Sequence, residues 1–331
     1  MTNKKKIAIS ILIVILFAVG AFVYFRLRPS PHQQVVKIGI ATWPGFASGM
    51  IGNDKKYFDG ISLEYKVIDD QPARYAAFQQ GDIDIINASL DEVAQTSGRL
   101  KGKIILVTDT SFGGDGIVVK PDIKTPAQLK GKRIAFARST PSHYLLYKVL
   151  QSQGLSPSDI QQVPVDDPGQ AGQAFLGGSV DAAVTWEPFL SEVKNKGNGH
   201  VLLTTRDYPG IIVDVLVASD KLAQNPDLLK RFIDGWLRSV QYVKNNPDDS
   251  SKLIATGLGV KGEDVQGMMA GLQFVDEQTN KVYFDSAEPS NTKIGNILRD
   301  AANIWKSQGI ISTIPEIDNL ISTFSLKYFH P

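Results

Sequence analysis

Hydroxyl and imidazole side chains gather at Ser139-Thr140-Pro141-Ser142-His143, where a predicted strand is followed by a predicted helix. Thr140 suits the N-cap position and Pro141 suits the first helical position. The free N–H groups of a helix start attract anions, and the hydroxyls of Thr140 and Ser142 could add hydrogen-bond donors. The segment therefore predicts a helix start that binds an anion, with an ordinary helix cap as the alternative.

Aromatic and amide side chains follow two other predicted strands. Trp43 and Phe46 come just after the first strand, where an aromatic ring could lie over an apolar or cationic ligand group. Asn87 and Ser89 end a later strand and offer further hydrogen bonds to a ligand. Core packing is the alternative for the aromatic pair, and helix capping is the alternative for the Asn87–Ser89 segment.

Carboxylates occur at two further strand positions. Trp186 and Glu187 end one predicted strand, and Asp214 interrupts the apolar run Ile211–Ala218. A carboxylate in a buried run needs a partner, because an unpaired buried charge is costly. We therefore expect Asp214, helped by Glu187 and by the ring of Trp43 or Trp186, to face a cationic or hydrogen-bond-donating ligand group. A structural ion pair with a lysine or arginine is the alternative.

Several classes of chemistry are excluded by what the chain lacks. It has no cysteine, which excludes disulfides, thiolate metal sites, thiol catalysis and a lipid anchor on cysteine. No histidine–acid cluster has metal-ligand spacing, and no nucleophile elbow, phosphate loop or dinucleotide fingerprint is present, so we expect no metal, no cofactor and no catalytic residue. Residues 1–31 carry five basic residues and no acid, so the remaining chain has a net charge of −4, which argues against a nucleic-acid partner.

The elements that position these residues alternate between short apolar strands and amphipathic helices from Val35 onward, which is typical of α/β proteins with mainly parallel sheets. A first β-α-β-α-β-α-β unit ends near Thr108, and the pattern restarts at Gly116. After Ala218 the chain is mostly helical, and Pro315–Leu326 is among the helices that the apolar spacing predicts.

The mostly helical segment after Ala218 must pack on one of the two earlier α/β units. This arrangement predicts a two-lobed fold. We expect one lobe from residues 36–112 and 215–331, and a second, inserted lobe from residues 117–211. Ligands of open α/β sheets bind outside the carboxyl ends of the strands, and a cleft between lobes is the usual pocket.

Four segments together resemble the nitrate/sulfonate/taurine-type substrate-binding proteins of ABC importers, a family that also includes binders of thiamin-precursor pyrimidines. They are Asp115–Lys120, Ile123–Ala135, Ser139–His143 and Asp181–Pro188. The resemblance implies a type II periplasmic-binding-protein fold, with two mixed or parallel sheets flanked by helices and hinge closure around the ligand. It also implies delivery to a membrane permease with an ATPase, and we include Asp115 among the expected ligand contacts.

The ligand class stays open at this point: sulfonate, carboxylate, nitrate-like anion, pyrimidine or amino-acid-like zwitterion. One alternative is an enzyme, because some relatives of the pyrimidine binders synthesise the pyrimidine with a pyridoxal-phosphate lysine and a sacrificial histidine. His143 is the only candidate histidine, and we find no matching lysine. Another alternative is a membrane-anchored ligand sensor. We expect a monomer in each case.

The run Ile7–Phe25 is uncharged, is 19 residues long and follows three lysines. A membrane-spanning helix needs about 20 apolar residues, whereas the apolar region of a signal peptide has about 7–15. The length favours an uncleaved inner-membrane anchor, with a cleaved signal peptide as the alternative. Both place the body on the periplasmic or extracytoplasmic side, because the lysines favour a cytoplasmic N-terminus.

We predict that the mature protein keeps this anchor. Mass measurement of the N-terminus of protein purified from its native membranes should find residues 7–25 still attached, with the protein in the membrane fraction. A new N-terminus near Ala21 or Phe22, with the protein in the soluble fraction, would contradict the anchor.

Overall fold

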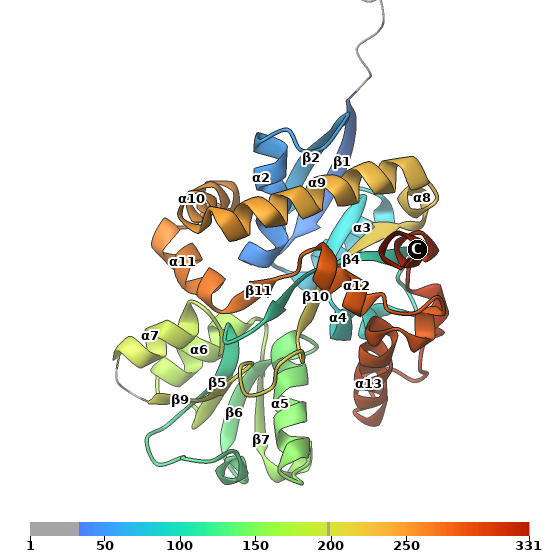
Figure 1. Ribbon diagram of the computed structural model, residues 1–331. Helices are drawn as coiled ribbons and strands as arrows, with labels where there is room; N and C mark the ends of the chain where they lie inside the picture. Colours follow the sequence, from blue (N-terminus) through green and yellow to red (C-terminus); the bar gives the residue numbers. More distant parts are fainter. Residues whose placement is uncertain (1–32, 197–198, 331) are drawn as a thin grey trace, which may run out of the picture.

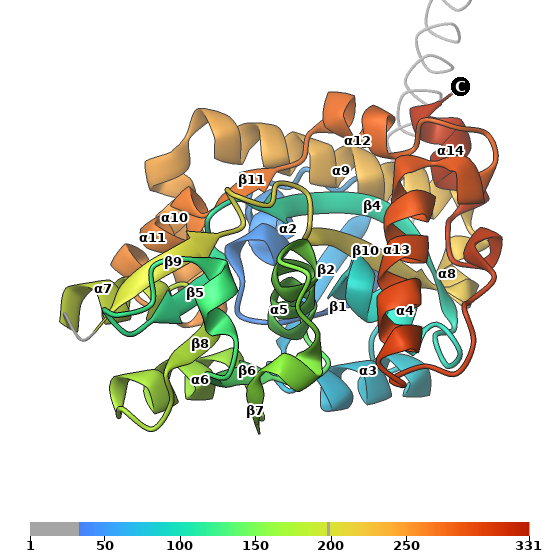
Figure 2. The same cartoon turned by 90° about the horizontal axis from the view of Figure 1, so that it is seen from below.

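The computed structural model describes residues 33–196 and 199–330, which form two α/β lobes joined by two chain crossings (Figures 1 and 2). The expected anchor, residues 7–25, lies outside the described residues. Within those described ranges, no helix is both long and apolar enough to cross a membrane.

The first lobe contains a six-stranded mixed sheet with the order β11-β4-β10-β3-β1-β2. Strand β1 runs parallel to β2 and β3, whereas β10 is antiparallel to both β3 and β4. Strand β10 therefore lies between β4 and β3, although it comes much later in the sequence than both. The strands are β1 (Gln34–Ile40), β2 (Ile61–Val67), β3 (Ile85–Ser89), β4 (Gly102–Ser111), β10 (Val213–Ser219) and β11 (Leu272–Phe274).

The second lobe contains a five-stranded sheet with the order β7-β6-β8-β5-β9, in which β6 is parallel to β7 and β8, and β5 is antiparallel to β8 and β9. Its strands are β5 (Asp115–Val119), β6 (Arg133–Ala137), β7 (Gln161–Val165), β8 (Ala182–Trp186) and β9 (His200–Thr204). Two mixed sheets flanked by helices confirm the expected fold class. The lobe boundaries 36–112, 117–211 and 215–331 stay a prediction.

Helices cover both sheets. Those of the second lobe are α5 (Pro141–Ser152), α6 (Pro168–Leu176) and α7 (Phe189–Lys196). Those of the first lobe are α2 (Ser48–Asp54), α3 (Gln71–Gln80), α4 (Leu90–Thr96), α8 (Asp220–Ala223), α9 (Pro226–Asn245), α10 (Pro247–Leu258), α11 (Gly262–Ala270), α12 (Glu277–Tyr283), α13 (Lys293–Ser307) and α14 (Thr323–Phe329). Short 3₁₀ helices occur at Pro44–Ala47, Pro126–Leu129, Pro157–Asp159, Pro289–Asn291 and Ile317–Asn319.

The longest helix, α9, shows how the sequence fixes these elements. Asn225 caps its start by accepting a hydrogen bond from the Leu228 N–H, and Pro226 occupies the first turn. Apolar residues at helical spacing, including Phe232 and Trp236, make one buried face. That face packs on the first lobe, and the helix runs across the top of the molecule in Figure 1.

The predicted helix over Pro315–Leu326 is wrong. The chain instead forms a 3₁₀ turn, then pairs Ile321 with Ile104 near the start of β4, and only then begins α14. The Ile104 N–H donates to the Leu320 carbonyl at 2.7 Å, and the Ser322 N–H donates to the Ile104 carbonyl at 2.9 Å. Pairing with the sheet therefore overrides the helical spacing of the apolar residues. Earlier in the chain, Pro44–Ala47 form a 3₁₀ helix for which Trp43 is the N-cap residue.

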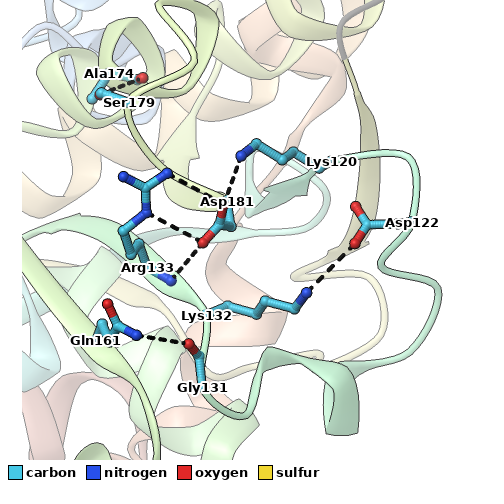
Figure 3. Close-up of polar contacts among 9 residues, drawn as sticks. All are labelled: Lys120, Asp122, Gly131, Lys132, Arg133, Gln161, Ala174, Ser179 and Asp181. Carbon is cyan, nitrogen blue, oxygen red and sulfur yellow. Dashed lines mark hydrogen bonds and ion pairs between the residues drawn. The ribbon is translucent and has the colours of Figure 1, made fainter.

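Asp181, in one of the sequence motifs, joins three strands of the second sheet (Figure 3). Its carboxylate accepts hydrogen bonds from Lys120 Nζ at 2.6 Å and from the Arg133 backbone N–H at 3.0 Å. Lys120 directly follows β5, Arg133 begins β6 and Asp181 precedes β8. These contacts give Asp181 a structural role in linking the strands, which accounts for its conformation without a ligand.

The two lobes contact each other through α5 and α13. Trp305 of α13 is fully buried, and its ring centroid lies 5.3 Å from that of His143 and 5.8 Å from that of Tyr144, both on α5. Trp305 Nε1 donates to the Asp91 carbonyl at 2.8 Å. One tryptophan therefore holds α13, the start of α4 and the second lobe together.

Trp305→Ala should lower the free energy of unfolding by about 3–5 kcal/mol, because it removes a fully buried aromatic side chain. Trp305→Phe keeps an aromatic ring and loses the hydrogen bond, so it should cost less. Denaturant unfolding of both variants measures the difference. Equal stability of the alanine variant and the parent protein would show that this contact does not hold the lobes.

Candidate functional site

Two buried carboxyl groups lie side by side in the first sheet, near the chain crossings. Asp109 on β4 and Asp214 on β10 are direct partners in the antiparallel register, and Ser89 on β3 is the partner of Asp214 on the other side. Directly opposed residues share one face of a sheet, so all three side chains lie on the same face. Asp109 is 0% exposed and Asp214 is 4% exposed.

Neutral donors hold Asp109 in place. Trp43 Nε1 donates to Asp109 Oδ2 at 2.9 Å, and Thr108 Oγ1 donates to Asp109 Oδ1 at 3.0 Å. The 3₁₀ helix after Trp43 approaches so closely that a Cβ at Gly45 would lie 1.9 Å from Asp109 Oδ1. Only glycine fits there without moving the carboxylate. Trp43 is thus fixed by this carboxylate as well as by packing.

Burial raises the pKa of Asp214 well above its ordinary value, and the charges of Asp109 and Asp115 raise it further. The pKa of Asp109 is also raised by burial, but its hydrogen bonds from Trp43 and Thr108 oppose the rise. These opposing effects favour the ionised form of Asp109 and the protonated form of Asp214.

Two further carboxyl groups face the same region from different elements. Asp115 begins β5 of the second lobe, is 3% exposed and has no hydrogen-bond partner for Oδ1 among the described residues. Asp91 lies in the first turn of α4, and both its carboxyl oxygens lack such a partner in the same residues. Burial raises the pKa of Asp115 to about 7 and, together with the Glu92 charge, that of Asp91 to about 8. Acidic groups from both lobes therefore lie in one region, and within the part of the chain that the structure describes none of the four forms an ion pair with a basic side chain.

The start of α5 has backbone donors that no side chain of the described residues caps. Thr140 is the N-cap residue, but its Oγ1 donates to the Ala137 carbonyl at 2.8 Å instead of capping the helix. Ser142 is fully buried, and its Oγ has no partner among the described residues. Ser139 precedes the helix with φ 65°, in the left-handed region that non-glycine residues rarely adopt. This geometry suits an anion at the helix start.

His143 lies on the first turn of the same helix and is 1% exposed. Its ring lies 4.7 Å from the Phe136 ring and 4.2 Å from the Tyr147 ring, measured between centroids. Nδ1 accepts a hydrogen bond from the Ser139 N–H at 3.0 Å. Burial, with the nearby Arg138 charge, lowers the pKa of His143 to about 3, so the ring is neutral and Nε2 carries the remaining hydrogen.

The other predicted residues divide between the two lobes. The Trp43 and Trp186 rings face each other across the lobes with centroids 6.5 Å apart, and Trp186 is the register partner of Asp115. Asn87 is fully buried, with both side-chain polar atoms unpartnered among the described residues. Phe46 packs in the core, and the Ser89 N–H donates to Glu92 at the start of α4. These last two positions match the packing and capping alternatives.

Glu187 lies at the end of β8, next to the region where the lobes meet, but its carboxylate is already engaged. It accepts hydrogen bonds from the Ser191 N–H at 3.1 Å and the Ser191 Oγ at 2.9 Å, at the start of α7. These contacts account for its conformation without a ligand. A role for Glu187 beside Asp214 stays a prediction.

A cavity of about 590 Å³ lies elsewhere, between α5, residues 208–211 and α13. It is lined by none of the predicted site residues, and two of its charged groups are paired with each other, as Lys148 Nζ lies 2.9 Å from Asp300 Oδ2. We therefore place the candidate site at the buried polar groups where the lobes meet. Among the described residues, no group of three His, Cys, Asp or Glu side chains could hold a metal ion.

Asp109 and Asp91 were missed from the sequence. Asp109 follows the apolar run of β4 just as Asp214 interrupts that of β10, so a search for acids within apolar strands would have found both. Asp91 precedes Glu92 in the first turn of a helix, where acidic residues commonly complement the helix dipole. Nothing in that local pattern indicates burial.

The chain is similar to several proteins of known name. It is 24% identical over 330 residues to the taurine-binding periplasmic protein of Escherichia coli K12, covering 95% of this chain and 97% of that protein. Its fold matches the crystal structure of the periplasmic aliphatic sulphonate binding protein SsuA from Escherichia coli, with a TM-score of 0.72, 20% identity, and coverage of 89% of this chain and 99% of that one.

An enzyme shares the fold as well. The structure of the desulfurization enzyme DSZB matches with a TM-score of 0.63 and 15% identity, covering 89% of this chain and 98% of that one. Structural likeness at this level of identity shows the fold alone. The family model described as NMT1/THI5 like matches residues 43–250, which is more than half of the chain. The chain therefore belongs to the NMT1/THI5-like family.

Proposed function

We propose that this chain is the extracytoplasmic substrate-binding protein of an ABC importer and that it captures a small organic anion bearing an amine, of the aminosulfonate type. The observation that carries the proposal is the pairing of an uncapped helix start with buried carboxyl groups. The start of α5 offers backbone donors and Ser142 to an anionic group. Asp109, Asp115 and Asp214 offer acceptors to a cationic group.

Other observations support this assignment. The named relative along almost the full length of the chain is a taurine-binding periplasmic protein, and taurine carries both an amine and a sulfonate. The Trp43 and Trp186 rings, one from each lobe, would enclose the short apolar part of such a ligand. A simple anion such as nitrate would leave the carboxyl groups unmatched.

The proposal includes the partners that an importer requires. A binding protein closes around its ligand and delivers it to a permease driven by an ATPase, so these are the expected partners. We propose a periplasmic body, attached to the inner membrane through residues 7–25 and monomeric.

We propose that the chain is a binding protein without catalytic activity. The pyrimidine-synthase alternative needs a reactive histidine beside a cofactor-bearing lysine. His143 is instead enclosed by Phe136, Tyr147 and Trp305, with its Nδ1 occupied by the Ser139 N–H. Incubation with pyridoxal phosphate should give no absorbance change typical of a lysine adduct. Appearance of that band would favour the enzyme.

Asp214→Asn should weaken taurine binding by about 2–3 kcal/mol, the scale of a hydrogen bond to a charged group. The ligand-free protein should keep or gain stability, because the substitution removes a buried ionisable group and keeps its shape. Calorimetry and thermal unfolding measure the two effects. Asp248→Asn, on an exposed helix start, is the matched control and should change neither.

A structural role for Asp214 predicts the opposite pattern. In that case the ligand-free Asp214→Asn protein would lose stability, and taurine affinity would change only slightly. That outcome would overturn the assignment of Asp214 to the cationic end of the ligand.

Ser142→Ala should weaken the binding of taurine and of ethanesulfonate by about 1 kcal/mol, because it removes an unpartnered hydroxyl from the anion end of the site. Thr140→Ala should weaken it less, because the Thr140 hydroxyl already donates to the Ala137 carbonyl. Ser158→Ala, an exposed hydroxyl in the same lobe, is the control. Unchanged affinity in the double variant, with the fold intact by circular dichroism, would place the anion elsewhere.

A further inference from the structure

Asp109 and Asp214 form a carboxyl pair that lacks a basic neighbour. In the ranges that the structure describes, no lysine, arginine or histidine nitrogen lies within the 4.0 Å of an ion pair from either carboxylate. Arg74 of α3 lies 4.0 Å from Glu92 of α4 and pairs with that residue instead. The pair must therefore be neutralised in another way, because two desolvated carboxylates repel each other.

The other charged and titratable groups around the pair add to this repulsion. Asp115 faces it from β5, and Asp91 and Glu92 approach from α4. The phenol of Tyr283 on α12 is also near Asp109, and that charge raises the tyrosine pKa beyond the effect of burial. No element packed around the pair supplies a compensating cation among the described residues.

A shared proton satisfies these constraints. Asp109 receives the Trp43 and Thr108 donors, which favour its ionised form, so the proton resides on Asp214. An independent feature indicates that a ligand group enters here. The Asn87 side chain is fully buried and unpartnered within the described residues, on the same face of β3 as Ser89, the register partner of Asp214.

We propose that the cationic group of the ligand replaces this proton, so that each capture event releases a proton to solvent. The O–H bond of Asp214 breaks, its electron pair stays on the carboxylate, and the proton passes to water. The ammonium group of the ligand then lies between Asp109 and Asp214 in its place. This inference rests on the proposed function, because it requires a ligand with a cationic end.

Two consequences follow from the linkage between protons and ligand. Taurine affinity should rise with pH, by up to tenfold per pH unit for one released proton, while Asp214 remains protonated in the ligand-free protein. A sulfonate without an amine should bind with no such dependence, because it leaves the proton on Asp214.

The direct test is calorimetric titration of the purified protein with taurine at pH 7 in phosphate and in imidazole, two buffers that contain no sulfonate and differ in protonation enthalpy. The observed binding enthalpy should differ between the buffers by an amount equal to the release of about one proton per taurine. Ethanesulfonate should show no difference. In Asp214→Asn the taurine difference should vanish, whereas Asp248→Asn should retain it.

Infrared spectroscopy gives a second test, which can be carried out even if Asp214→Asn binds taurine too weakly for calorimetry. Infrared spectra of the ligand-free protein at pH 7 should contain carboxylic-acid carbonyl absorption, and the part contributed by Asp214 should be lost on addition of taurine and be missing from Asp214→Asn, while the absorption of protonated Asp91 and Asp115 remains. Taurine binding with equal enthalpies in both buffers and an unchanged absorption would overturn the proton release and leave the proposed function standing. Failure of taurine and ethanesulfonate alike to bind would overturn both.

Discussion

Desolvation of carboxyl groups is the constraint on which the rest of this structure depends. Asp91, Asp109, Asp115 and Asp214 come from four elements and both lobes, yet all four are buried where the lobes meet. Trp43 and Thr108 hydrogen-bond one of them, and Gly45 leaves room for it. The first turn of α4 carries Asp91, where the helix dipole favours negative charge. The fold thus holds four buried carboxyl groups close together, and their negative charge must be neutralised by a cation or by bound protons.

The same backbone serves proteins with different chemistry, as its likeness to a desulfurization enzyme and to sulfonate-binding proteins shows. What separates such proteins is the set of side chains at the junction of the lobes. In this chain the junction combines neutral His143, unpartnered Ser142 and the acidic residues. We propose that these groups bind and orient a ligand.

The sequence predicts the fold well because strands and helices here follow strong local patterns. Apolar strands alternate with capped helices from β1 to β10, and the late helical segments show clear amphipathic spacing. The prediction failed at Pro315–Leu326, where pairing of Ile321 with distant Ile104 decides the conformation. The site was harder to predict for the same reason. Asp214 was found because its own neighbours are apolar, whereas Asp91 is buried by α5 and α13, which lie far from it in sequence.

The position of β10 inside the first sheet has a consequence for the order of assembly. Residues 115–204 supply every strand of the second sheet, and they precede β10 in the chain. The first sheet must wait, because β10 separates β3 from β4 and cannot be replaced by an earlier segment. Until residue 213 arrives, the apolar edges of β3 and β4 have no partner strand between them. The second sheet can therefore form from one continuous stretch of chain before the first sheet is complete, although the first sheet contains the N-terminal strand β1.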